Sequence, residues 1–228
     1  MGEASSSPFA VMAQLEFSDR SQRKPDYSNE KVVQRNKLAA RAYYIPDTSI
    51  SLSGVWDFHY AQSPELAPSW DDMNAQDESS WQPITVPGHW QLQGYGIPQY
   101  TNIVFPFPVC PPTSPTDNPT GSYLKKFYVP KSWSPDSQIR LRFEGVDSAF
   151  HLFVNGTDVG YSQGSRNPAE FDVSSYVKRN MENKILVRVY QWSDGSYIED
   201  QDQWWLSGMR GLVSSQLGTT DALIRDLP

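Results

Sequence analysis

The segment Ile139-Arg140-Leu141-Arg142-Phe143-Glu144 decides the fold class of this chain. Apolar and charged residues alternate in it with a period of two. Successive side chains of a β-strand point to opposite faces, so this pattern is typical of a strand with one buried and one solvated face. Antiparallel sheets commonly have such faces. The segment therefore predicts a half-buried strand in an all-β protein.

Similar strand patterns lie on both sides of this segment. Residues 50–60 carry aromatic side chains at alternate positions, at Trp56, Phe58 and Tyr60. Residues 150–154 run into Asn155-Gly156, which favours a type I′ hairpin turn because both residues tolerate a positive φ. A return strand through residues 159–161 is expected after this turn.

Two further strands are predicted over residues 123–129 and 184–192, which are rich in β-branched and aromatic residues. Several short strands separated by turn signals predict a β-sandwich. Residues 98–121 cannot enter the interior of a sheet, because each proline there fixes φ and removes a hydrogen-bond donor. Such a long, stiff loop indicates either a function or a packing surface.

The ends of the chain differ from this pattern. Residues 1–25 are Ser-rich and polar, which predicts a mobile arm. Residues 29–41 show a weak helical pattern, which predicts a short helix. We divide the chain into an amino-terminal arm at 1–48, a sandwich domain at 49–208 and a tail at 209–228.

Length and composition exclude several classes of protein. The 228 residues suffice for one sizeable domain, and the net charge of −7 provides no positive field for a nucleic acid. The single Cys110 cannot form an internal disulfide, and three scattered histidines cannot assemble a Cys/His zinc site. Neither a signal peptide nor an apolar stretch of membrane-spanning length is found. We expect a soluble cytoplasmic protein with no membrane partner.

An acidic segment follows the strand predicted at 184–192. It places four carboxylates within nine residues, and Trp192, Trp204 and Trp205 flank it; the carboxylates belong to Asp194, Glu199, Asp200 and Asp202. The segment is open to three interpretations: a solvated acidic loop, a hard-cation site with oxygen ligands, or an aromatic platform beside carboxylates that bind a sugar. A second candidate is Asn102, whose amide can both donate to and accept from sugar hydroxyls, although a lone asparagine is commonly a turn residue.

Seven blocks of the chain point to a known family. They are SGVWDF at 53–58, PGHWQLQGY at 87–95, YTN at 100–102, NPTG at 118–121, FEGVDSAF at 143–150, VGYSQGSR at 159–166 and WSDGSY at 192–197. In wording and order they resemble the amino-terminal sugar-binding domain of the large, bacterial-type β-galactosidases of glycoside hydrolase family 2. The resemblance covers about residues 26–208. It implies a jelly-roll form of the β-sandwich.

The resemblance also implies roles for individual residues. Asn102 is similar to an asparagine that hydrogen-bonds the galactosyl unit, and Asp202 to an aspartate that contacts a galactosyl hydroxyl and ligates Na⁺. A peripheral Mg²⁺ is implied as well. Its ligands would be Asp26, Asn29, Val32 through its carbonyl, Gln163 and Asp194. Oxygen ligands of this mix suit a hard divalent cation.

The chain also departs from the family. The catalytic glutamates of family 2 lie in a (β/α)₈ barrel of roughly 250 residues, which is more than this chain contains. After Gly208 the family pattern is lost. The resemblance therefore implies the sugar-binding part of a retaining β-galactosidase, which hydrolyses terminal non-reducing β-D-galactosyl groups and is homo-oligomeric when whole. We expect this chain alone to be inactive.

Two alternatives remain open. The chain could be a stand-alone galactose-binding or interaction module without catalysis. It could also complement a β-galactosidase that lacks its amino-terminal part.

Overall fold

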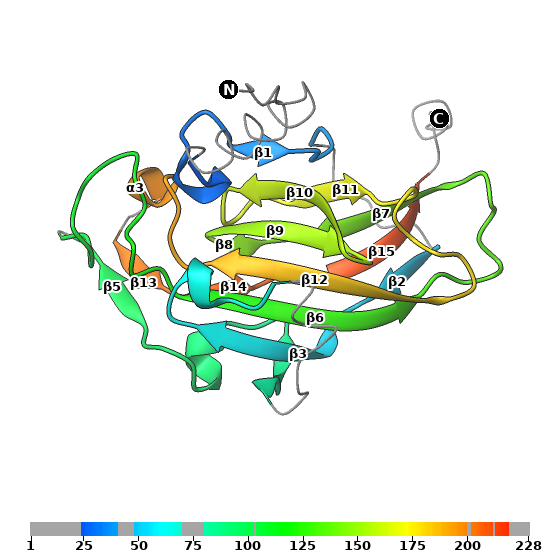
Figure 1. The fold of residues 1–228 in the computed structure, drawn as a ribbon, viewed down its shortest axis with the longest axis horizontal. Helices are drawn as coiled ribbons and strands as arrows, with labels where there is room; N and C mark the ends of the chain where they lie inside the picture. Colours follow the sequence, from blue (N-terminus) through cyan, green and yellow to red (C-terminus); the bar gives the residue numbers. More distant parts are fainter. Residues whose placement is uncertain are drawn as a thin grey trace, which may run out of the picture.

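The computed structural model describes residues 24–40, 48–69, 80–102, 104–199, 202–211 and 213–218. These residues form two packed antiparallel sheets with almost no helix, so the predicted all-β sandwich is confirmed (Figure 1). The predicted mobile arm at residues 1–25 lies outside the described residues except for its last two positions. Within the described ranges, no helix is long and apolar enough to span a bilayer.

The larger sheet has seven strands. In spatial order they are β1 (Gln34–Arg35), β10 (Thr157–Gln163), β9 (Ala149–Val154), β12 (Glu182–Tyr190), β6 (Thr120–Tyr128), β3 (Gly54–Ala61) and β4 (Gln82–Val86). The smaller sheet has four: β11 (Ala169–Asp172), β7 (Gln138–Phe143), β15 (Val213–Gly218) and β2 (Ser49–Ser51).

Two short ribbons complete the strands. One pairs β5 (Gln99–Thr101) with β13 (Gln203–Trp205), and the other pairs β8 (Val146–Asp147) with β14 (Gly208–Met209). The helical segments are one turn each: η1 (Asp26–Ser28), η2 (Pro64–Leu66), η4 (Trp90–Gln93) and α3 (Ser196–Glu199). The β5–β13 ribbon and α3 lie together at one end of the sandwich (Figure 1).

The core lies between the two sheets. Ile139, Leu141 and Phe143 of β7 point into it, as their alternation predicts. The opposite face of β7 is less exposed than predicted, because Arg142 is only 2% exposed. Its guanidinium donates to Glu144 Oε1 at 2.5 Å and to Glu170 Oε1 at 3.1 Å, so this buried charge is paired.

The predicted hairpin is present. Asn155 and Gly156 have φ of 49° and 91°, and they connect β9 to β10. Asn155 also donates to Tyr176 O and to Asn183 Oδ1, both at 2.8 Å. Its side chain therefore fastens the turn to the neighbouring loop.

Two predictions at the ends of the sandwich need correction. Residues 29–40 contain no helix; Gln34 and Arg35 instead form β1 and pair with the edge of β10. Ladder partners from tertiary structure outweigh a weak local helix propensity. The domain boundary at Gly208 falls inside the sandwich, because β15 pairs with β7 and with β2. Residues 219–228 of the tail lie outside the described part.

Candidate functional site

The β5–β13 ribbon brings the two predicted sugar-binding residues together. Thr101 is paired with Gln203 and Tyr100 with Trp204, so the next step of the antiparallel register sets Asn102 opposite Asp202. The two positions are a hundred residues apart in the sequence. The ribbon therefore forms a candidate site that neither strand contains alone.

The two faces of this ribbon have different environments. Thr101 and Trp205 are buried, with exposures of 0% and 3%. Tyr100 and Trp204 are 51% and 62% exposed, and Asn102 and Asp202 are also exposed. Alternation along a strand places residues two apart on the same face. The outer face consequently carries two aromatic rings, one amide and one carboxylate; we call these four residues the ribbon face.

Hydrogen bonds connect the polar members of the ribbon face. The Tyr100 hydroxyl donates to Asp202 Oδ1 at 2.5 Å, and Asn102 Nδ2 donates to the Tyr100 oxygen at 3.4 Å. The hydrogen bond to Asp202 is the largest cause that raises the pKa of Tyr100 above its ordinary value. The phenol is protonated at neutral pH, as an ordinary tyrosine is, and its hydroxyl links Asp202 to Asn102.

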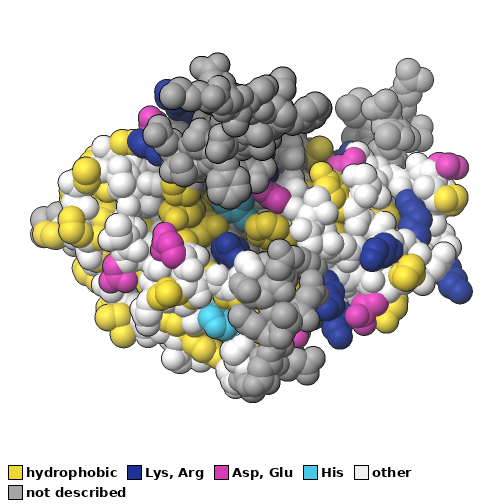
Figure 2. All heavy atoms as spheres, in the orientation of Figure 1, with side chains coloured by type: hydrophobic (Ala, Val, Ile, Leu, Met, Phe, Trp, Pro, Cys, Tyr) yellow, Lys and Arg dark blue, Asp and Glu magenta, His cyan; other side chains and the backbone are white. Residues whose placement is uncertain are grey.

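Aromatic and apolar side chains surround these polar groups. The rings of Tyr100 and Trp204 have centroids 5.3 Å apart. Apolar side chains gather on the left of Figure 2, the end at which Figure 1 places β5, β13 and α3. Exposed rings beside hydrogen-bonding groups are suited to a sugar, whose C–H face stacks while its hydroxyls form hydrogen bonds.

The proline-rich loop packs against the other face of β13. Trp205 stacks on Trp192 with centroids 5.0 Å apart and donates from Nε1 to Gln191 O at 3.1 Å. Phe107 of the loop lies 4.8 Å from the ring of Trp192. Tyr197 donates to Thr113 O at 2.8 Å, which anchors the loop to α3. The loop is thus a packing surface that supports the ribbon from behind.

The acidic segment divides into carboxylates with different surroundings. Glu199 accepts from Ser165 N at 2.8 Å and from Ser165 Oγ at 2.6 Å, so it is part of the framework. Asp194 is 8% exposed, whereas Asp202 is exposed. Asp200 lies outside the described residues. The solvated-loop interpretation therefore fails for Asp194 and Glu199.

The residues expected to hold the peripheral Mg²⁺ meet where the arm joins the sandwich. Asp194 N donates to Tyr27 O at 2.9 Å, and Gln163 N donates to Val33 O at 3.3 Å. The Gln163 side chain hydrogen-bonds Asp194. Val32 packs on the small buried cluster of Ala149, Tyr161 and Tyr190. The arm segment 26–33 is therefore placed directly against Gln163 and Asp194.

Asp194 fits a hard cation through Oδ2, since its Oδ1 accepts from Gly195 N at 2.9 Å. Gln163 fits in part, because its Oε1 already accepts from the Tyr161 hydroxyl at 2.7 Å. Burial raises the pKa of Asp194, and the nearby Glu30 charge raises it further. Both effects disfavour the ionised carboxylate, and a bound cation would stabilise it. Asp26 fits less completely. Its Oδ2 accepts from His151 Nε2 at 3.0 Å and from Arg35 Nε at 3.2 Å, which leaves only Oδ1 for a metal. Asn29 Oδ1 accepts from Lys31 N at 3.2 Å.

Acidic and histidine side chains alone do not form a metal centre. Among the described residues, no group of three or more His, Cys, Asp or Glu side chains could hold a metal ion. Both implied cations would therefore depend on amide, carbonyl or hydroxyl oxygens. For Na⁺, the suitable group is Asp202, whose Oδ2 is not used by the hydrogen bond from Tyr100.

Sequence reasoning did not identify Tyr100, His151 or Arg35 as partners of the candidate residues. For Tyr100 a signal was available, because it is two positions from Asn102 and therefore on the same strand face. His151 and Arg35 carry no comparable signal. His151 reaches Asp26 across 125 positions of sequence, and only the fold shows that contact.

The fold and the ribbon face define a class: a β-sandwich domain with an exposed aromatic and polar surface suited to carbohydrate. Comparison with known families agrees, because residues 50–216 match the model described as "Glycosyl hydrolases family 2, sugar binding domain". The chain belongs to this family.

Within this family, the chain is similar to proteins named beta-galactosidase. The chain is 46% identical over 190 residues to a protein of Kluyveromyces lactis named beta-galactosidase, covering 82% of this chain and 18% of the relative. It is 50% identical over 158 residues to the Psychromonas ingrahamii beta-galactosidase, covering 69% of this chain and 15% of the relative. The chain thus spans less than a fifth of the length of these relatives.

Solved structures support the fold. A beta-glucuronidase of Bacteroides uniformis superposes with a TM-score of 0.55 at 18% identity, covering 74% of this chain and 18% of that chain. The Bifidobacterium dentium beta-glucuronidase superposes with a TM-score of 0.54 at 19% identity, covering 78% of this chain and 31% of that chain. At these identities the likeness concerns the sandwich alone.

Proposed function

We propose that this chain is the sugar-binding part of a retaining β-galactosidase that hydrolyses terminal non-reducing β-D-galactosyl groups in β-galactosides such as lactose. The main support is the β5–β13 register, which sets Asn102 opposite Asp202 on an exposed aromatic surface. The curated relatives named beta-galactosidase support the choice of sugar.

In this proposal the ribbon face binds and orients the sugar and carries out no chemistry. Asp202 accepts from a galactosyl hydroxyl, and Asn102 hydrogen-bonds a second hydroxyl. The acid and nucleophile of a retaining glycosidase must flank the scissile bond at about 5–5.5 Å from each other. Those groups would come from the rest of a longer, homo-oligomeric protein, so the chain by itself is inactive.

We also propose two cation sites in this part. Na⁺ would bind at Asp202 and neutralise charge beside the sugar. Mg²⁺ would bind at Asp194 and Gln163, with Asn29, the Val32 carbonyl and Oδ1 of Asp26 completing its oxygen ligands. Bound there, Mg²⁺ would supply a structural cross-link between the arm and the sandwich.

The test compares sugar binding in matched aspartate variants of the 228-residue chain. Titration of ¹⁵N-labelled protein with methyl β-D-galactopyranoside, with and without Na⁺, should give millimolar affinity and shifts centred on the ribbon. Asp202→Asn should weaken binding, and Asp136→Asn, at an exposed aspartate between β6 and β7, should not change it. Methyl β-D-glucopyranoside should bind more weakly.

A chromogenic β-galactoside assay on the same preparation tests the lack of turnover. Activity that Asp202→Asn abolishes would contradict the proposal that catalysis requires a further part. The alternative of a stand-alone module predicts the same binding, but it also predicts that no catalytic barrel follows the codon for Pro228 in the gene. Sequencing past that codon distinguishes the two.

A further inference from the structure

The ribbon face contains a hydrogen-bond chain whose direction can be derived. Asp202 Oδ1 lies 2.5 Å from the Tyr100 hydroxyl, and an ionised carboxylate can only accept. The single phenol proton is therefore donated to Asp202. The Tyr100 oxygen is left as an acceptor towards Asn102, whose Nδ2 lies 3.4 Å away. The amide of Asn102 must consequently direct its NH₂ group to Tyr100.

This direction determines which atoms remain for a ligand. Asp202 Oδ2 and Asn102 Oδ1 receive no hydrogen bond from the described residues. Both atoms are acceptors. A molecule that contacts these two oxygens must therefore donate hydrogen bonds to them or carry positive charge, while the second N–H of the Asn102 amide remains as a donor.

We propose that Tyr100 is a positioning residue that orients Asp202 and Asn102, so that the ribbon face selects a neutral, hydroxyl-donating sugar and rejects an acidic sugar. This inference rests on the proposed function of the same face. It adds a residue and a selection rule: the sugar should carry two donating hydroxyls and no carboxylate on the side that meets the ribbon.

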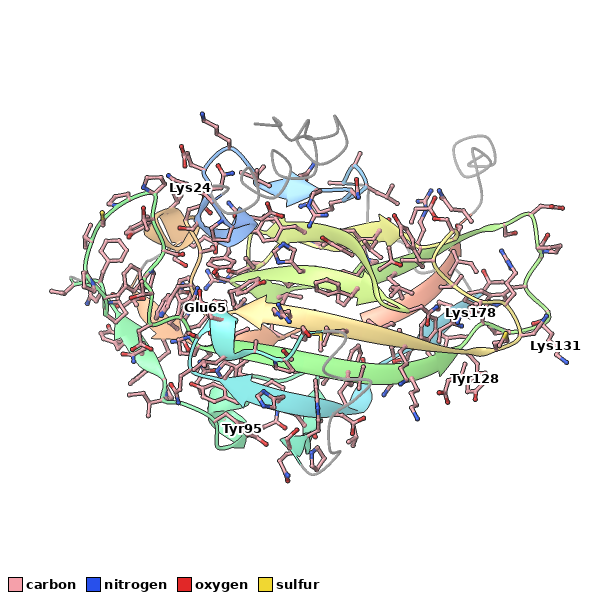
Figure 3. The ribbon with its side chains drawn as sticks, in the orientation of Figure 1. Lys24, Glu65, Tyr95, Tyr128, Lys131 and Lys178 are labelled. Carbon is pink, nitrogen blue, oxygen red and sulfur yellow. The ribbon has the colours of Figure 1, made fainter. Side chains whose placement is uncertain are left out.

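The charges around the ribbon support this selection. In the absence of Na⁺, a sugar carboxylate at the ribbon face would lie against the Asp202 carboxylate, and like charges held close together are unfavourable. Arg166 donates to Gln203 Oε1, and Gln203 belongs to the alternate face of β13. Figure 3 places Lys131 and Lys178 at the end opposite the ribbon, whereas Lys24 lies at the ribbon's end of the longest axis and is paired with Glu30 at 3.8 Å.

Packing explains why a tyrosine can hold this position although it is exposed. The ring of Tyr100 lies against Trp204, and its strand is paired along β13. These contacts restrain the ring of Tyr100 and so hold its hydroxyl beside Asp202. Tyr100→Phe removes the hydroxyl and keeps the ring, which separates positioning from packing.

The experiment uses Tyr100→Phe with Tyr128→Phe as its matched control. Tyr128 is also exposed, at 61%, and donates to a carboxylate, Glu182, at 3.3 Å, at the far end of the sandwich. Each variant is titrated in Na⁺-free buffer with methyl β-D-galactopyranoside and with its uronate analogue, methyl β-D-galactopyranosiduronate, at matched ionic strength. Melting temperatures are recorded for every variant.

The wild-type chain should prefer the neutral glycoside by about ten-fold or more, an effect typical of a like-charge contact. Tyr100→Phe should weaken binding of the neutral glycoside about five-fold, as expected for one lost hydrogen bond, with the melting temperature unchanged. Tyr128→Phe should bind as wild type. Asp202→Asn should remove the discrimination against the uronate. Equal affinity for both glycosides, or wild-type binding by Tyr100→Phe, would overturn the inference.

Crystal structures of the wild type and Tyr100→Phe separate this inference from the proposed function. If neither protein binds a galactoside, the proposed function fails. The positioning role is then decided by the Asp202 carboxylate, which should rotate or lose its single orientation in Tyr100→Phe. An unchanged carboxylate and an unchanged Asn102 amide would refute the positioning role.

Discussion

The two faces of β13 use the same residue types for different purposes. Trp205 is 3% exposed, stacks on Trp192 and has its indole N–H paired with Gln191 O. Its neighbour Trp204 is 62% exposed and lies against Tyr100. One tryptophan stabilises the sandwich, and the adjacent one is available to a ligand. Residue type alone therefore does not distinguish a core residue from a recognition residue.

The carboxylates show the same contrast. Asp147 and Asp194 are 6% and 8% exposed, and burial is the main cause that raises the pKa of each. Asp202 is exposed and keeps one oxygen free of the hydrogen bond from Tyr100. The proposed sugar binding at the ribbon face thus depends on residues that the core does not use.

The largest expected difference between the two faces concerns the tryptophans. Trp205→Ala should reduce the free energy of unfolding by about 3–5 kcal/mol, because it removes a buried ring and leaves a cavity. Trp204→Ala should change it by less than about 1 kcal/mol while weakening galactoside binding. Urea denaturation followed by circular dichroism measures both. Equal losses of stability would show that the two faces do not differ as described.

A buried carboxylate should make stability depend on pH. Burial raises the pKa of Asp147 to about 6 from its ordinary 3.8, so the folded state binds more protons than the unfolded state between these values. Stability should therefore fall as pH rises from 4 to 6, by at most about 3 kcal/mol for a shift of roughly two pK units. Asp147→Asn should remove this decrease, whereas Asp202→Asn should retain it. If the stability of Asp147→Asn fell with pH as that of the wild type does, the expectation would be wrong.

Loss of the contacts that join the arm to the sandwich should reduce stability by an intermediate amount. Asp26→Ala removes hydrogen bonds from His151 and Arg35 and should cost about 1–3 kcal/mol at pH 7. The hydrogen bond with His151 is the main cause that lowers the pKa of Asp26, so its contribution should be lost as pH falls below the ordinary value of 3.8. Asp158→Asn, which affects only the outer contact of Arg35, should cost less. Thermal unfolding and limited proteolysis of the arm measure the effect.

The smallest expected effect concerns the proposed Mg²⁺ site. Mg²⁺ at about five times its Kd should stabilise the chain by ~1 kcal/mol, if it binds only the folded state. Asp194→Asn should remove this gain, and Asp202→Asn should keep it. Calcium-free and magnesium-free buffers with a chelator serve as the baseline for the melting temperature. A gain that persists in Asp194→Asn would place the cation elsewhere.

Much of the fold could be predicted from local patterns. The alternation in β7, the aromatic period in β3 and the Asn155-Gly156 turn each depend on neighbouring residues. The helix expected over residues 29–41 was wrong for the described part, because β1 obtains its partners from β10. The burial of Arg142 was missed for a related reason, since its partner Glu170 belongs to a different strand.

The candidate site was predictable as a set of residues but not as an arrangement. Asn102 and Asp202 were predicted from the family resemblance, whereas the pairing of β5 with β13 places them opposite each other. The role of Tyr100 depends on a hydrogen bond across 102 positions of sequence. The contact between Asp26 and His151 could not be predicted either, because these residues are 125 positions apart in the sequence.

By itself, the sequence determined the all-β class, the main strands and the residue types available for a sugar, because side-chain periodicity and turn chemistry act over a few residues. Only the tertiary structure decided which tryptophan is buried, which carboxylate stays free and which tyrosine joins the site. Those outcomes depend on strand register and burial, which arise when segments far apart in the chain meet.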